Sequence, residues 1–109
     1  MDEKQKLLTF FEAENKRDWD LYATFLHPEI IWELHTDEKS VISGEVEYLK
    51  FIKEAYRKKD AHFICRELHA SKNGRRLVTI LENDSGELSC DIFEFREGLI
   101  HREYEFILG

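Results

Sequence analysis

The second half of the chain contains four strand-like segments, and these constrain the fold most strongly. From His62 onward polar and apolar residues alternate in the runs HFICRELHA, RRLVTILEN, ELSCDIFEFR and LIHREYEFIL, joined by the short connections SKNG, DSG and EG. Alternation with a period of two is typical of strands that bury one face, and short connections join antiparallel neighbours. An antiparallel meander is therefore predicted. Its Asn73-Gly74 pair predicts a tight turn with positive φ at both central residues.

The first half of the chain has helical periodicity. Leu7, Phe10, Phe11 and Glu14 recur at helical spacing, which predicts an amphipathic first helix. Asp18 is a candidate N-cap for a short second helix that Pro28 stops. A third helix is predicted after Ser43 or Gly44, with a buried stripe formed by Val46, Leu49, Ile52, Ala55 and Tyr56.

One further strand is predicted between the second and third helices. In EIIWELH the residues Ile30, Trp32 and Leu34 share one face, whereas Ile31, Glu33 and His35 share the other, and a polar loop follows. Three helices can cover only one face of the resulting sheet, so an α+β fold is predicted. The absence of repeats and linkers predicts a single domain over residues 1–109.

Composition argues against several classes of protein. The net charge of −7 disfavours nucleic-acid binding, and the basic run of Lys53, Arg57, Lys58 and Lys59 fits a solvated helix end. No apolar run resembles a signal peptide or a membrane span, so a cytoplasmic protein without a membrane partner is expected. Cys65 and Cys90 are interpreted as reduced, and the scattered histidines predict no metal site. No cofactor is expected.

Asp91 is the main candidate for a functional residue. It shares one strand face with Phe93 and Phe95, so a carboxyl group is expected among aromatic rings. If the corresponding face of the last strand is concave, Arg102 and Tyr104 join Asp91 there. Asp91 then either pairs with Arg102, recognises a ligand, or transfers protons with a pKa raised by apolar surroundings.

The order of elements, the segment HPEIIWEL and the hairpin CDIFEFREGLI resemble the SnoaL-like branch of the nuclear transport factor 2-like superfamily. The resemblance covers essentially the whole chain. It implies a cystatin-like cone, in which a strongly curved antiparallel sheet wraps around N-terminal helices and encloses a pocket, usually in a homodimer. The superfamily includes polyketide cyclases, steroid isomerases, dehydratases, epoxide hydrolases and proteins that only bind.

The resemblance also suggests roles for individual residues. Asp91 matches an aspartate that steroid isomerases keep protonated as a hydrogen-bond donor, and it also matches the acid/base aspartate of the polyketide cyclases. The isomerase tyrosine falls at Phe10 and the proton-shuttling aspartate at Leu34, although a slip of one residue would place Glu33 there. The histidine that the cyclases add has no clear counterpart. Isomerisation by the steroid mechanism is therefore not expected.

These observations leave three functional classes open: a small-molecule enzyme, a noncatalytic binder and an assembly module with a filled pocket. The leading prediction is a pocket that binds an apolar or aromatic carbonyl-containing metabolite, with cyclase-, isomerase- or hydrolase-type chemistry at Asp91. Trp32 either lines this pocket or fills it. Glu67 is a weak further candidate. The ligand-binding set is Trp32, Leu34, Phe10, Phe93, Arg102 and Tyr104. The half-apolar face that carries Cys90 and Ile92 predicts a homodimer through the convex sheet.

Overall fold

The structure is a computed structural model that describes residues 1–109, and it contains three helices and six strands. The helices are α1 (Glu3–Lys16), α2 (Trp19–Ala23) and α3 (Glu45–Tyr56). The strands are β1 (Leu26–His35), β2 (Lys39–Ser43), β3 (Phe63–Ala70), β4 (Arg76–Asn83), β5 (Leu88–Arg96) and β6 (Leu99–Ile107). The α+β class predicted from the sequence is confirmed.

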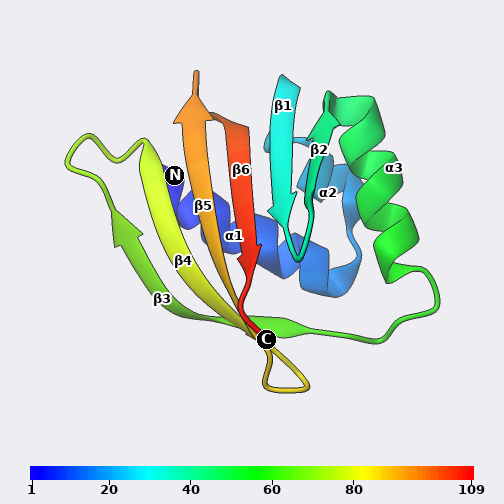
Figure 1. Cartoon of the computed structure of the whole chain (residues 1–109). Coiled ribbons are helices and arrows are strands. Elements are labelled where there is room, and N and C mark those ends of the chain that lie inside the picture. The colour runs from blue at the N-terminus through cyan, green and yellow to red at the C-terminus, as the bar shows by residue number, and fades with distance from the viewer.

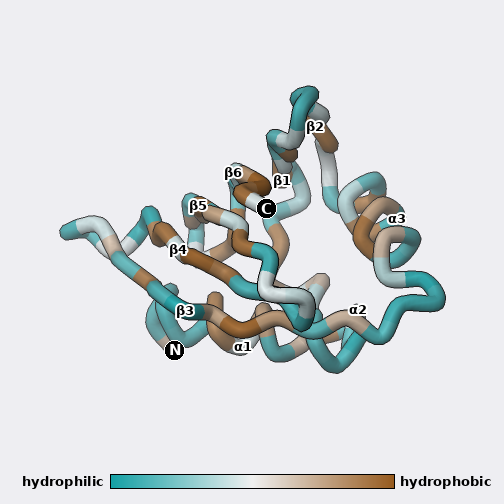
Figure 2. Tube along the Cα trace, turned by 60° about the horizontal axis from the view of Figure 1, so that its bottom comes forward, coloured by the Kyte–Doolittle hydropathy of each residue, from teal (hydrophilic) through white to brown (hydrophobic).

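All six strands form one sheet in the order β2-β1-β6-β5-β4-β3. Neighbouring strands are antiparallel except β1 and β6, which pair in parallel. The sheet is curved and unclosed, α1 crosses its concave side, and α3 lies beside the β1–β2 end (Figure 1). Figure 2 shows hydrophobic segments in α1 and along β4. This arrangement leaves the convex face of the central strands without a helix over it.

The core lies between α1 and the concave face of the sheet. On α1 the predicted stripe is buried, since Leu7 and Phe10 are 0% and 1% exposed. The ring of Phe10 meets Phe93 of β5 edge to face, with centroids 6.2 Å apart. Asp91, Phe93 and Phe95 are all buried, which confirms that they share the inner face of β5. Burial of these aromatic side chains contributes to the hydrophobic stabilisation of the core.

Three local predictions were wrong. On α3 the expected stripe is buried only at Ile52, whereas Val46 is 78% exposed, Ala55 is exposed, and Tyr48 takes the second buried position.

Lys39–Ser43, expected as a polar loop, forms edge strand β2, because its backbone hydrogen-bonds to β1 although its side chains are mostly exposed. Pro28 does not end a helix but lies inside β1, since α2 already stops at Ala23. The β1–β6 register shifts between Leu26 and Ile31, and such an irregularity tolerates a residue that lacks a backbone N–H.

The hairpin between β3 and β4 also differs from its prediction. Gly74 has a φ of 73°, but Asn73 does not have positive φ. The backbone N–H of Gly74 donates to the carbonyl of Ser71 at 2.9 Å, and the Asn73 side chain accepts from Arg75 N at 2.9 Å. The loop is therefore wider than a two-residue turn, and only glycine occupies the left-handed region. In the whole chain no helix has the length and apolar character needed to cross a membrane.

Candidate functional site

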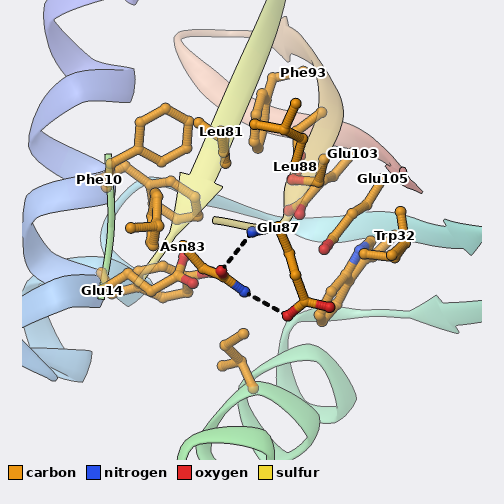
Figure 3. Close-up of a pocket in the computed structure, with 17 residues that line it drawn as sticks. Phe10, Glu14, Trp32, Leu81, Asn83, Glu87, Leu88, Phe93, Glu103 and Glu105 are labelled. Atoms are coloured by element: carbon orange, nitrogen blue, oxygen red, sulfur yellow. Dashed lines mark hydrogen bonds between the residues drawn. The ribbon is translucent and has the colours of Figure 1, made fainter. Parts of the chain in front are cut away.

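A cavity of about 210 Å³ lies between the helices and the concave face of the sheet (Figure 3). Its lining comes from α1, α2, α3, β1 and β3–β6 and includes the β4–β5 turn. The lining residues are Phe10, Phe11, Glu14, Tyr22, Trp32, Ile52, Phe63, Leu81, Asn83, Glu87, Leu88, Ser89, Asp91, Phe93, Glu103, Glu105 and Ile107. A mainly apolar, largely preformed cavity with a few convergent polar groups is the usual form of a small-molecule site.

A β-bulge in β6 decides which of its side chains enter this cavity. Near the β5–β6 turn Phe95 pairs with Ile100 and Glu94 pairs with Arg102, so His101 is an extra residue on β6. Beyond the bulge Phe93 pairs with Glu103. Because an inserted residue reverses the parity of a strand, Glu103 and Glu105 face inward, where an uninterrupted alternation from Ile100 would place Arg102 and Tyr104.

The expectation that Arg102 and Tyr104 share the cavity with Asp91 is therefore wrong. Both side chains lie on the convex side of the sheet. A guanidinium nitrogen of Arg102 lies 3.0 Å from Nε2 of His101, and the Tyr104 hydroxyl donates to Glu94 at 3.4 Å. Asp91 forms no ion pair with Arg102 or with any other residue.

The structure brings the other predicted site residues only partly together. Phe10, Trp32 and Phe93 line the cavity together with Asp91. Leu34 lies on the same face of β1 as Trp32 but is half-buried and does not line the cavity. Their roles in binding or catalysis remain predictions.

Two alternative candidates lie outside the cavity. Glu33 lies on the opposite face of β1 from Trp32, where its carboxylate is 3.2 Å from His35. Glu67 is exposed on β3 and lies 3.2 Å from His69. Neither carboxyl group can therefore take part in the chemistry of the cavity in this conformation.

Two buried acids, Asp91 and Glu103, and the half-buried Glu105 form the centre of the site. The carboxyl oxygens of Asp91, Glu103 and Glu105 all lie within 4.8 Å of one another. The hydroxyl of Ser89 donates to Oδ1 of Asp91 at 2.6 Å, and the hydroxyl of Tyr48 donates to Glu103. No lysine, arginine or histidine is among the lining residues, so no protein cation neutralises these acids.

Burial changes the protonation of the cluster. Loss of solvent raises the pKa values of Asp91 and Glu103 well above their ordinary range, and the neighbouring Glu105 raises them further. Burial raises the pKa of Glu105 to about 7, against the opposing effect of the nearby indole N–H of Trp32. Near neutral pH the cluster therefore contains protonated carboxyl groups beside one that is close to its titration midpoint.

Glu14 of α1 is a fourth acid in the cavity. Its pKa is raised to about 7, chiefly by burial, although it accepts a hydrogen bond of 2.5 Å from the hydroxyl of Tyr56, which lowers the pKa. The sequence carries a signal for this residue, because an acid falls on the apolar stripe of an amphipathic helix. For Glu103 and Glu105 the signal was ambiguous, since the opposite face of the same strand, with Tyr104 and Phe106, is more aromatic.

Trp32 contributes an unpaired hydrogen-bond donor. The side chain is 4% exposed, and its indole Nε1 is buried without a hydrogen-bond partner. Figure 3 shows the indole nitrogen turned toward Glu105. An unsatisfied buried N–H costs free energy, so this group favours an additional acceptor in the cavity.

Two groups of side chains offer metal-ligating atoms. Asp91, Glu103 and Glu105 offer one oxygen each, fewer than the roughly six or more that a hard divalent cation takes, and His27, Glu29 and His101 form a second group outside the cavity. The second group is a poor metal site, because the guanidinium group of Arg102 contacts the His101 ring, and Nδ1 of His27 accepts from the backbone N–H of Glu29 at 3.0 Å.

Comparisons with known proteins identify the fold. No protein-family model and no curated protein matches the chain. A proposed ketosteroid isomerase from Kribbella flavida superposes with a TM-score of 0.86 at 22% identity, over 98% of this chain and 78% of that one. A SnoaL-like protein of unknown function from Burkholderia thailandensis gives a TM-score of 0.84 at 16% identity, over 97% and 94% of the two chains.

A third solved structure, a proposed polyketide cyclase from Sinorhizobium meliloti, gives a TM-score of 0.80 at 18% identity over 93% of each chain. Identities this low establish a shared fold and leave the chemistry open, because one fold hosts many functions. The chain therefore has the nuclear transport factor 2-like fold of SnoaL-like, ketosteroid isomerase-like and polyketide cyclase-like proteins, as the resemblance of its sequence indicated.

Proposed function

We propose that the cavity binds a small, largely apolar molecule with a carbonyl oxygen, and that its buried acids transfer a proton to and from that molecule. The observation that carries this proposal is the close approach of Asp91, Glu103 and Glu105, whose carboxyl oxygens all lie within 4.8 Å without a neutralising cation. Carboxyl groups this close cannot all ionise in an apolar site, so a donor and an acceptor lie side by side.

The chemistry follows from the different protonation of the acids. Protonated Asp91 or Glu103 donates a hydrogen bond to the carbonyl oxygen and stabilises the negative charge that develops there. Ionised Glu105 takes a proton from the carbon beside the carbonyl and returns it to the same or a neighbouring carbon, so the overall reaction is a proton transfer. A pKa near 7 suits Glu105 to this exchange at neutral pH. Tyr48 holds the Glu103 carboxyl group in place through its hydroxyl.

The direct test is exchange of α-hydrogens in deuterated water, followed by NMR on small ketones such as cyclopentanone and cyclohexanone. The cavity of 210 Å³ has room for about seven water-sized groups at roughly 30 Å³ each, so compact ketones are the suitable probes. We expect exchange above the buffer rate with the wild-type protein and loss of this excess in Glu105→Gln. Glu38→Gln, in the exposed β1–β2 turn, is the matched control. Absence of exchange with every ketone would refute proton transfer.

A second candidate function is a noncatalytic homodimeric binding or assembly module with a filled pocket. The size of the cavity favours it, since 210 Å³ is below the roughly 300 Å³ at which ligand pockets usually begin. The proposed interface is the convex face, where half-buried Ile92 lies across from Tyr104 and Cys90 lies across from Phe106. Apolar side chains of neighbouring strands with no helix over them suit a two-fold contact.

A further inference from the structure

The cavity has an unusual balance of charge. Its 17 lining residues include five acids and no basic side chain. Glu14, Asp91, Glu103 and Glu105 line its interior, and exposed Glu87 lies in the β4–β5 turn, where it accepts a hydrogen bond from Asn83 at 3.0 Å. The electrostatic potential inside the cavity is therefore negative whenever any of these groups ionises. The low dielectric of the cavity walls makes this potential stronger than it would be in water.

Aromatic rings form much of the remaining wall. The rings that line the cavity belong to Phe10, Phe11, Tyr22, Trp32, Phe63 and Phe93. Aromatic faces attract organic cations through the ring quadrupole, most strongly when the cation is desolvated. The three carboxyl groups offer a metal ion one ligand atom each, which replaces only part of its water shell, and 10 of the lining residues are hydrophobic. These walls therefore suit a cation that carries its charge on an apolar surface better than a metal ion.

The charged and titratable groups around the cavity do not neutralise its acids. Arg17 lowers the pKa of Glu14, but this is the smallest of the influences on that group. The guanidinium group of Arg17 stacks on Tyr56 at 4.0 Å and donates to the backbone carbonyls of Lys59 and Ala61. Tyr22, Tyr48 and Tyr56 have pKa values raised chiefly by burial, so their hydroxyls stay neutral. The only way to balance ionised acids inside this cavity is to take up protons or a cationic ligand.

The indole N–H of Trp32 is a second, independent observation, because it favours an ionised form of Glu105. It is buried, has no partner and is turned toward Glu105. When Glu105 is ionised and a cation lies beside it, the carboxylate becomes a strong acceptor for this N–H. A bound cation therefore balances the acids and keeps Glu105 ionised, so that the Glu105 carboxylate can accept from the indole N–H.

We infer that the ligand of this cavity carries a small ammonium group, held against the aromatic rings and balanced by Glu105 and its neighbours Asp91 and Glu103. This inference rests on the proposed function and deepens it by naming the charge class of the molecule. The oxygen of the ligand meets a protonated carboxyl group, and its ammonium group meets the ionised one.

Binding of a cation is coupled to release of protons. Glu14 and Glu105 have pKa values of about 7 and bind protons in the empty cavity below that pH. A cation favours their ionised forms, so its affinity increases as the pH rises through about 7, and binding releases on the order of one proton. A neutral ligand of the same shape has no such dependence.

The test compares choline with its uncharged carbon isostere 3,3-dimethylbutan-1-ol, by calorimetry on the intact chain. Tetramethylammonium is a smaller second cation. We expect at least one of the two cations to bind at least about tenfold more tightly than the isostere. For that cation we expect a heat of binding that changes with the ionisation enthalpy of the buffer, because protons are released. The preference should increase from about pH 6 to about pH 8.

Variants connect this preference to the cavity. Glu105→Gln should reduce the preference for the cation to within about threefold, whereas Glu38→Gln removes the same charge from an exposed turn and should leave it unchanged. Circular dichroism of both variants checks that they fold. If Glu105→Gln fails to fold, Trp32→Phe is the second variant, and loss of the indole donor should weaken cation binding more than isostere binding.

Three results would overturn the inference. They are equal affinities for the cations and the isostere, tighter binding of the isostere, and failure of both cations to bind. If Mn²⁺ binds and neither ammonium ion does, the inference is also overturned, because the cavity then selects a metal ion and not an organic cation. The ketone exchange assay is independent of all of these, so the proposed proton transfer can stand when the inference about charge fails.

Discussion

Asp91 of β5 lies directly across from Glu105 of β6 in the antiparallel pairing, and both side chains enter the cavity. Like charges in this relationship destabilise a sheet, unless a proton or a cation separates them. The pair therefore links the stability of the fold to pH and to ligand binding.

Stability should fall as the pH rises from about 4.5 to about 7. Folding raises the pKa values of Glu14 and Glu105 from 4.5 to about 7, so in this range the folded state holds protons that the unfolded state has released. We expect the melting temperature to decrease by on the order of 10 °C between about pH 5 and about pH 8. The double variant Glu14→Gln/Glu105→Gln should give a flatter profile. A wild-type profile that is flat or rises across this range would contradict the raised pKa values.

Asp91 should tolerate replacement better than an ion-paired acid would. Because it has no cationic partner, Asp91→Asn should change the free energy of unfolding by less than about 1 kcal/mol. Asp91→Leu also removes the acceptor of the Ser89 hydroxyl and should cost about 1 kcal/mol more, whereas Ser89→Ala isolates that hydrogen bond. Urea unfolding measures all three. A loss on the order of 3 kcal/mol in both Asp91 variants would indicate a broken buried ion pair.

The β3–β4 hairpin depends on the backbone of Gly74. Its φ of 73° is unfavourable for a β-branched residue, although an added Cβ would meet nothing within 4 Å. Gly74→Val should therefore destabilise the fold by on the order of 1 kcal/mol or more through backbone strain alone. Gly74→Asn should cost less, because asparagine tolerates the left-handed region. Equal thermal stability of the wild type and the valine variant would show that this turn has a different conformation in solution.

The convex face should mediate dimer formation. Ile92→Lys places a charge among the half-buried apolar residues of this face and should convert the dimer to a monomer in sedimentation experiments. Val46→Lys adds the same charge to α3, where the side chain is 78% exposed, and should have no effect. A wild-type protein that sediments at micromolar concentration as a single species near 13.1 kDa would rule out this dimer.

Local periodicity placed the residues of α1, β1 and β5 correctly, but on α3 it failed for Val46 and Ala55, which are exposed. The stripe on α1 and the shared face of Asp91, Phe93 and Phe95 follow from repeats of 3.6 and two residues, and the structure confirms both. The inward face of β1 was also correct, since Ile30 and Trp32 are 0% and 4% exposed. The fold class followed from the order of these elements.

Only the tertiary structure decided the membership of the acid cluster. His101 is an extra residue in β6 opposite β5. Because of it, Glu103 and Glu105 enter the cavity in place of Arg102 and Tyr104. A bulge is a property of the pairing between two strands, whereas alternation is a property of one strand, so the sequence of β6 alone could not reveal the change of face. The raised pKa values have the same origin, because the acids come from three separate elements and lose their solvent only when α1 packs against the concave face of the sheet.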